Sequence, residues 1–195
     1  MHYISDILYW ISTGLLVPVI VLLIMLFARA LLLIGSFFGQ YLAVCQTEAL
    51  LKQEFDNLNS ENVRTLAERL PKTQKSLVVN YMHRMLQHQD SEAHLQKLLA
   101  DFDIAAVANL STSKTLAKMG PMLGLMGTLI PMGPALVGLS TGDIASMAYN
   151  MQVAFATTVV GLFSAAIGFI TGQVKTRWYR RDSVNLQFLA DLLEH

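Results

Sequence analysis

The feature that most restricts how this chain can fold is a 55-residue stretch, residues 119–173, in which Asp143 is the only charged residue. Two apolar segments flank this aspartate. Each is long enough to cross a bilayer core of roughly 30 Å as a helix. In the first segment Gly or Pro recurs at steps of 4, 3, 4, 3 and 4 residues, at Gly120, Gly124, Gly127, Pro131, Pro134 and Gly138. The second segment repeats these steps with small residues, at Ala154, Thr158, Gly161, Ala165, Gly168 and Gly172.

This spacing keeps one narrow face of each helix free of large side chains. Lipid supplies no hydrophobic force between helices, so membrane helices associate through close backbone contact at small residues. We therefore assign helix packing to Gly120, Gly124, Gly127, Pro131, Pro134, Gly161, Ala165 and Gly168. Two tightly packed transmembrane helices with no further role would show the same spacing.

The composition of the whole chain agrees with a membrane protein. Apolar residues make up 53% and charged residues 14% of the sequence, against about 25% charged residues in a soluble domain. The net charge is zero, which gives no reason to expect a nucleic-acid partner. The single cysteine, Cys45, excludes an internal disulfide and a cysteine-built zinc site, and we expect a buried, inert thiol.

The N-terminal region predicts a first membrane span. Residues 7–28 form a run of 22 residues without charge, which is enough to span the bilayer. Pro18 predicts a kink in this helix. Arg29 ends the uncharged run, but apolar residues continue to Phe38, so the helix is expected to leave the bilayer without stopping. We expect no cleavable signal peptide, because the first six residues contain no Lys or Arg.

Residues 46–118 differ in character from the segments around them. Charges of both signs alternate along this region, and apolar residues recur at helical spacing, as at Leu95, Leu98, Leu99 and Phe102. Pro71 predicts a break between two helices. We predict a helical bundle outside the membrane, whose last helix runs into the second membrane segment. After the third segment, Val184, Phe188 and Leu192 predict one more amphipathic helix.

The sequence thus predicts an all-α integral membrane protein with three transmembrane helices. Its parts are an N-terminal segment with the first span (1–38), a cytoplasmic helical region (39–118), the second span (119–139), a short outside turn (140–147), the third span (148–174) and a cytoplasmic C-terminal helix (175–195). The orientation follows from the basic residues. Nine of the 14 Lys and Arg lie in residues 46–118 and four in residues 175–181, and basic flanking segments stay on the cytoplasmic side. The N-terminus is therefore expected outside.

No pattern in the chain indicates enzyme catalysis, a metal site or a cofactor. His83, His88 and His94 are separated by 5 and 6 residues, which does not place them on one helical face as ligands. The usual nucleotide, hydrolase and metalloprotease motifs are missing. Spans two and three also lack the intramembrane charge that usually marks an ion path. If ions cross here, the chain supplies a polar lining through Thr128, Thr157 and Thr158, although membrane threonines commonly bond only to their own helix.

Two motifs carry a resemblance to a known family. Residues 120–132 read GPMLGLMGTLIPM, and residues 154–169 read AFATTVVGLFSAAIGF. These runs resemble the second-helix and last-helix patterns of the MotA/TolQ/ExbB proton channel family, and the order of the predicted spans is similar to its three-span TolQ/ExbB branch. The motifs cover about 55 residues, whereas the architecture covers the whole chain.

The resemblance implies an ion-conducting, stator-type subunit of a rotary motor in the inner membrane. Five copies would form a ring around the single transmembrane helices of a dimeric ExbD/TolR/MotB-like partner, whose aspartate carries the ion. Thr128 and Thr158 match pore-lining threonines of the family, and Thr157 adds a hydroxyl beside the second. What the motor would drive, including protein transport at the outer membrane, is left open by the resemblance.

The sequence departs from the family pattern at two places. Pro131 and Pro134 replace residues that favour a regular helix, so we expect the outer half of span two to be bent or unwound. Val153 stands where the family commonly has an acid, which leaves open whether the ion is a proton or sodium. Asp143 remains on the outer side, where a capping or turn role competes with ion gathering.

Two other classes of function fit parts of the sequence. A membrane scaffold that recruits partners through its cytoplasmic helices and conducts nothing would need only the packing seams. A small secondary transporter subunit would use proline-broken helices to line a substrate site, but the sequence shows no intramembrane charge in spans two and three and no inverted repeat.

Overall fold

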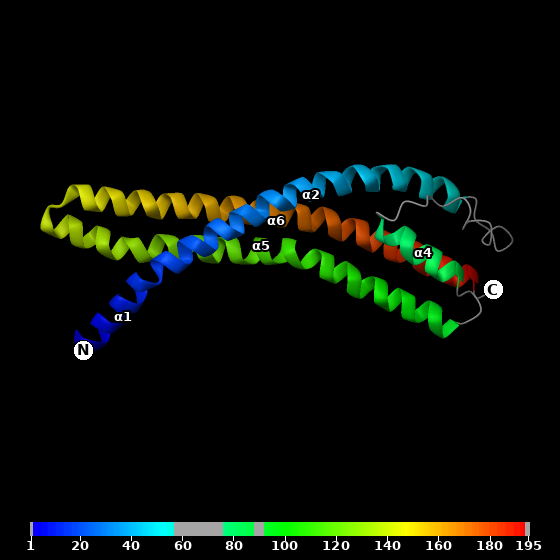
Figure 1. Ribbon diagram of the computed structural model, residues 1–195, viewed down its shortest axis with the longest axis horizontal. Helices are drawn as coiled ribbons and strands as arrows, with labels where there is room; N and C mark the ends of the chain where they lie inside the picture. The colour runs from blue at the N-terminus through cyan, green and yellow to red at the C-terminus, as the bar shows by residue number, and fades with distance from the viewer. Residues whose placement is uncertain (1, 57–75, 88–91, 194–195) are drawn as a thin grey trace. The chain divides into compact units, whose positions relative to one another are not determined.

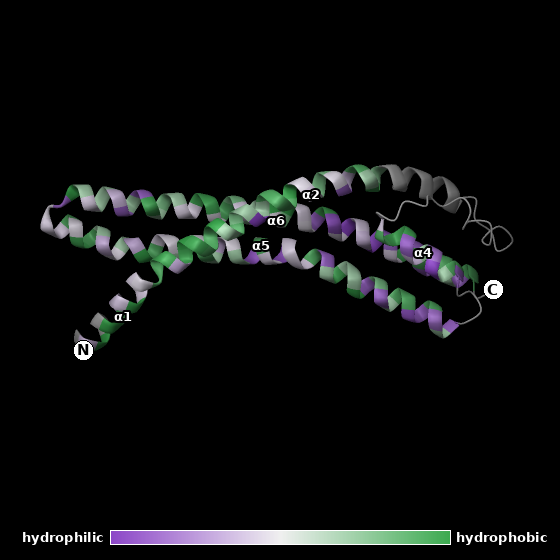
Figure 2. Ribbon diagram, in the orientation of Figure 1, coloured by the Kyte–Doolittle hydropathy of each residue, from purple (hydrophilic) through white to green (hydrophobic). Residues whose placement is uncertain are grey.

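The computed structural model describes residues 2–56, 76–87 and 92–193, and these residues contain helices and no strand. The helices are α1 (His2–Gly14), α2 (Leu16–Asp56), α4 (Leu77–Gln87), α5 (Glu92–Thr141) and α6 (Ile144–Leu193) (Figure 1). Among the described residues, three helical segments are long and apolar enough to cross a membrane: Ile7–Cys45, Glu92–Thr141 and Ile144–Leu193 (Figure 2). The prediction of an all-helical membrane protein with three spans is therefore supported. The helix break predicted at Pro71 lies outside the described residues.

The chain divides into two compact units. The first comprises Met1–Ile34 and Thr112–Gly172, and the second comprises Gly35–Ser111 and Gln173–His195. The helices α2, α5 and α6 each contribute residues to both units.

The N-terminal helix breaks earlier than a kink at Pro18 predicts. The break between α1 and α2 falls at Leu15, where the amide of Leu15 still bonds to the carbonyls of Ile11 and Ser12 (both 3.1 Å). Pro18 has no amide hydrogen to offer the carbonyl of Gly14, and its ring crowds that carbonyl. The break therefore lies one turn before the proline, beside a glycine that is a poor helix former.

The helix α5, in contrast, continues through Pro121, Pro131 and Pro134. We expected the outer half of this span to be bent or unwound, and the expectation of unwinding is wrong because the helix is continuous there. Each proline removes one backbone hydrogen bond from the helix, and packing against neighbouring helices commonly compensates for this loss in membrane proteins. Pro131 is fully buried, which is consistent with such compensation.

A tight turn joins α5 to α6, and its hydrogen bonds satisfy both helix ends. Gly142 has a positive φ of 75°, and the amide of Asp143 bonds to the carbonyl of Gly138 at 2.8 Å. This is a Schellman motif at the end of α5. The Asp143 carboxylate then accepts a hydrogen bond from the amide of Ser146 at 3.0 Å and so caps the start of α6.

The cap gives a test that separates two roles of Asp143. Asp143→Ala is expected to lower the free energy of unfolding by about 1 kcal/mol, because an amide at the start of α6 loses its acceptor. Asp143→Asn keeps a capping oxygen but removes the charge, so its thermal unfolding should match that of the original protein. Ion flux that falls in Asp143→Asn without loss of stability would assign ion gathering to this residue instead.

In the first unit, α2 packs against both α5 and α6. Val19 and Leu23 of α2 form one buried cluster with Leu123 of α5. A second cluster joins α2 to both other helices through Ala30, Leu33, Leu116 and Ile167. Most other large side chains of α2 in this unit are exposed, which suits a helix that faces lipid on its remaining sides.

In the second unit, α4 packs on α5 and α6 around a larger apolar core. As the spacing of the leucines predicts, Leu95, Leu98 and Phe102 are buried there. Opposite them lie Met82 and Met85 of α4, which are both 0% exposed. Phe102→Ala is expected to lower the free energy of unfolding by about 3–5 kcal/mol. Chemical unfolding followed by circular dichroism would measure this loss, and a loss below about 1 kcal/mol would mean that the core is not formed.

Two expectations for the helical regions are wrong. The C-terminal tail is not a separate helix, because α6 runs without interruption to Leu193. The buried apolar residues of the tail are Leu186, Leu189 and Ala190. Of the predicted apolar positions, Val184 and Phe188 are exposed and Leu192 is half-buried. Cys45 is also exposed rather than buried.

Candidate ion-path residues

The first unit places the two small-residue seams of α5 and α6 against each other. A methyl group added at Gly120 would lie 2.5 Å from the carbonyl oxygen of Gly161, and one added at Gly161 would lie 2.6 Å from the carbonyl oxygen of Gly120. A methyl group at Gly168 would lie 2.6 Å from the backbone nitrogen of Ala117. The two backbones are therefore in contact, and at these glycines any side chain would force them apart.

Other residues of the seams are less tightly packed. A methyl group at Gly124 would lie 3.6 Å from the backbone of Gly161 and Thr158, which is ordinary van der Waals contact. Ala165 is buried beside Gly120, and Pro131 is buried, whereas Pro134 is half-buried. The seams thus pack α5 against α6 within one chain.

The three predicted ion-path threonines lie near this contact, at similar positions along the helix axis. Thr157 lies beside Gly127, and the backbone of Thr158 lies beside Gly124. Thr128 directly follows Gly127, so the threonines lie within about 6 Å of one another along the helix axis. The structure therefore brings all three to one level of the α5–α6 pair.

The hydroxyl groups differ in exposure. Thr157 is buried, and its side chain fills the space left by Gly127. Thr128 and Thr158 are half-buried. The Thr128 hydroxyl donates to the carbonyl of Leu125 at 2.7 Å, and the Thr158 hydroxyl donates to the carbonyl of Ala154 at 3.1 Å. Each therefore bonds to its own helix, yet its oxygen retains lone pairs that can accept another hydrogen bond.

Thr128 and Thr158 face away from α2. On α5, Thr128 is five residues after Leu123, which contacts α2, and is therefore about 140° around the helix from it. On α6, Thr158 is nine residues before Ile167, which belongs to a cluster with α2, and is about 180° from it. Both half-buried hydroxyls thus lie on the side of the α5–α6 pair opposite α2.

This side of the pair is apolar apart from the two hydroxyls. Its exposed residues near the threonines include Leu125 and Met132 on α5 and Phe155 and Leu162 on α6. Residues 119–139 and 148–174 contain no charged residue. Within these two spans, α5 and α6 therefore supply no charged group to this side.

Sequence reasoning assigned Thr157 to the ion path but missed the buried stripe of hydroxyls to which it belongs. Thr157, Ser164 and Thr171 are spaced by seven residues on α6 and are 8%, 0% and 4% exposed. Thr171 Oγ1 lies 3.2 Å from Ser113 Oγ on α5 and 2.7 Å from the carbonyl of Ile167. The seven-residue spacing was the available signal for this buried stripe, because it keeps residues on one helical face.

The described residues give no support for a metal centre. No group of three or more His, Cys, Asp or Glu side chains among them could hold a metal ion. Of the three histidines considered above, His83 is half-buried, His94 is exposed and His88 lies outside the described residues.

Comparisons with known proteins identify the family of this chain. No curated protein matches the chain. The profile of the MotA/TolQ/ExbB proton channel family matches residues 52–187, more than two thirds of the chain, including the whole α5–α6 pair of the first unit. With three apolar helices long enough to cross a bilayer and this match, the chain belongs to the MotA/TolQ/ExbB proton channel family of multi-pass membrane proteins.

Proposed function

We propose that this chain is the ion-conducting, stator-type subunit of a membrane motor. Five copies form a ring around a dimeric single-span partner of the ExbD/TolR/MotB kind, and the ion passes between the ring and the partner. The observation that carries this proposal is the position of Thr128 and Thr158 on the side of the α5–α6 pair away from α2. A ring built with α2 outward turns these two hydroxyls toward its centre.

The partner's aspartate supplies the charge that spans two and three lack. An aspartate at the centre of a membrane helix costs about 2.5–3.5 kcal/mol on insertion scales. A threonine hydroxyl can accept a hydrogen bond from the protonated carboxyl group, and it can donate one to the carboxylate when its O–H turns away from the carbonyl of its own helix. Thr128 and Thr158 can therefore offset part of this cost in both protonation states without holding the ion permanently.

The ion gradient supplies the energy for movement. Moving one elementary charge across 100 mV releases about 2.3 kcal/mol. This is enough to bias a rotation or register step of the partner within the ring. We propose the proton as the ion, with sodium as the alternative because Val153 replaces an acid of the family pattern.

The proposed location is the inner membrane, with the N-terminus outside and the C-terminus in the cytoplasm. The distribution of Lys and Arg supports this orientation, because the 140–147 turn has none while residues 175–181 have four. The second unit, which contains α4, is then the cytoplasmic helical region.

Ion flux in proteoliposomes tests the proposal. The chain is reconstituted alone and together with a single-span partner that has an intramembrane aspartate, and flux is followed with pH-sensitive and sodium-sensitive dyes. We expect flux only from the pair, and its loss when the partner's aspartate is replaced by asparagine. A pair that assembles but conducts neither ion would contradict the proposal and favour a membrane scaffold that recruits partners through the second unit.

A further inference from the structure

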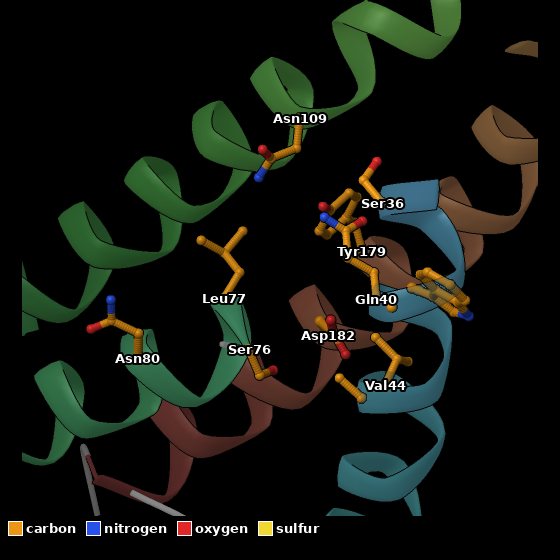
Figure 3. A pocket seen from close by; sticks show the side chains of 12 residues that line it. Ser36, Gln40, Val44, Ser76, Leu77, Asn80, Asn109, Tyr179 and Asp182 are labelled. Atoms are coloured by element: carbon orange, nitrogen blue, oxygen red, sulfur yellow. The ribbon is translucent and has the colours of Figure 1, made fainter. Parts of the chain in front are cut away.

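A cavity of about 520 Å³ lies within the second unit, among α2, α4, α5 and α6 (Figure 3). Cavities of roughly 300–1,000 Å³ are typical of small-molecule sites in proteins. Residues of all four helices line it, together with Ser76, which directly precedes α4: Ser36, Gly39, Gln40, Ala43, Val44, Ser76, Leu77, Asn80, Asn109, Trp178, Tyr179 and Asp182. Neither the helix packing nor the proposed ion path uses this cavity.

Aromatic contacts hold one wall of the cavity in place. The Trp178 ring stacks on Phe37 with ring centres 5.5 Å apart and planes 8° apart, and Tyr41 contacts the same ring at 5.9 Å. The Tyr179 ring packs edge-on against Phe102 at 6.5 Å. These contacts restrict the wall before any ligand binds, which lowers the entropic cost of binding.

The polar groups of the lining favour a positively charged ligand. Asp182 is the one charged residue among the twelve that line the cavity, so no Lys, Arg or His side chain of the described residues lines it. Amide and hydroxyl oxygens, such as those of Asn80 and Ser36, add further acceptors. Two aromatic rings, Trp178 and Tyr179, complete the set, and aromatic rings attract ammonium groups.

The Tyr179 phenol contributes a neutral group at this wall. Burial, with a contribution from the nearby Asp182 carboxylate, raises the pKa of Tyr179, although a hydrogen bond to Asn109 acts in the opposite direction. The phenol therefore stays protonated at physiological pH. It adds no second negative charge and leaves Asp182 as the anionic group of the lining.

We propose that this cavity binds an organic ammonium group. The carboxylate of Asp182 and the aromatic wall recognise the charge, and the amide and hydroxyl oxygens accept the ammonium hydrogens. Two sources can supply this chemistry. One is the headgroup of phosphatidylethanolamine, since Trp178 and Tyr179 lie four and five residues beyond the predicted third span (148–174), near the level where aromatic residues meet lipid headgroups. The other is a free amine in solution.

Binding to the full chain in detergent micelles tests the proposal and separates the two sources. Native mass spectrometry compares phosphatidylethanolamine with phosphatidylglycerol, which lacks an amine, and calorimetry measures ethanolamine and spermidine. We expect saturable binding of phosphatidylethanolamine or of a free amine, and no comparable binding of phosphatidylglycerol. Asp182→Asn should weaken this binding about tenfold or more, since it keeps an acceptor oxygen but removes the charge that strengthens the hydrogen bond to the ammonium group. Asp191→Asn, at an exposed acid on the same helix, should leave binding unchanged.

Two glycines of α2 give a matched pair of variants that does not alter Asp182. Gly39 lines the cavity, whereas Gly35, one turn earlier, does not, and both have open space where a side chain would begin. Gly39→Leu should therefore fill the cavity and block binding, whereas Gly35→Leu should not. If Asp182→Asn fails to fold, the comparison of amine binding between these two glycine variants still tests the proposal. The absence of saturable binding by any amine probe, or binding that survives in Gly39→Leu, would overturn the proposal.

Discussion

Replacing Thr158 with valine is expected to reduce ion flux through the assembled complex by about tenfold to a hundredfold, the equivalent of one hydrogen bond to a charged group. Valine keeps the shape of threonine and removes only the hydroxyl. In the single chain this hydroxyl bonds to the carbonyl of Ala154 and is half-buried, so the helices should pack as before. Flux in proteoliposomes measures the loss, and gel filtration checks that the assembly is intact.

Thr157→Val is the matched comparison for this experiment. It removes a hydroxyl from the neighbouring position by the same change in shape, but Thr157 is buried beside Gly127. We expect a smaller loss of flux than in Thr158→Val, because this hydroxyl must leave the α5–α6 contact to reach an ion. Full flux in Thr158→Val would remove Thr158 from the ion path, and equal losses in both variants would place both hydroxyls on it.

Gly161→Ala is expected to destabilise the α5–α6 pair by about 1–3 kcal/mol, as overpacking of a close-packed contact typically does. The added methyl group would lie 2.6 Å from the carbonyl of Gly120 and 2.9 Å from the Cα of Gly124. Both are backbone atoms, so the helices must move apart. Gly161→Leu should separate them entirely and prevent assembly of the ring.

Gly124→Ala is the control for this prediction and should act in the opposite direction. Its methyl group would have ordinary contacts at 3.6 Å, and alanine favours a helix over glycine by up to about 1 kcal/mol. Thermal unfolding in detergent is expected to show a lower midpoint for Gly161→Ala and an unchanged or higher one for Gly124→Ala. Equal behaviour of the two variants would mean that the seam is not packed as described.

The sequence predicts the spans and the seams well because both depend on local patterns. An uncharged run such as residues 7–28 restricts the chain to a membrane helix whatever surrounds it. The glycine spacing likewise indicates a packing face, because small residues are required wherever helix backbones meet. The spacing does not reveal which helix packs against each seam. In the structure the seams of α5 and α6 face each other within one chain, whereas the same spacing would fit a contact between chains equally well.

The features that sequence reasoning misjudged depend on tertiary packing. From local chemistry, Pro131 predicts a bent or unwound helix. In the structure α5 is continuous through this proline, which is fully buried. Cys45 has an apolar side chain that is typically buried, but no described helix covers it. Likewise, the choice between Leu186 and Val184 as buried positions is set by where α4 and α5 pack on α6. The side of the α5–α6 pair that Thr128 and Thr158 share also follows only once α2 is placed.

The stoichiometry of the complex tests the central claim most directly. The chain would be produced together with a single-span partner that has an intramembrane aspartate, purified in mild detergent and weighed by native mass spectrometry. The ion-driven motor predicts five copies of this chain, each of 21.6 kDa, with two of the partner. A stable monomer or dimer of this chain, with no partner bound, would contradict the account.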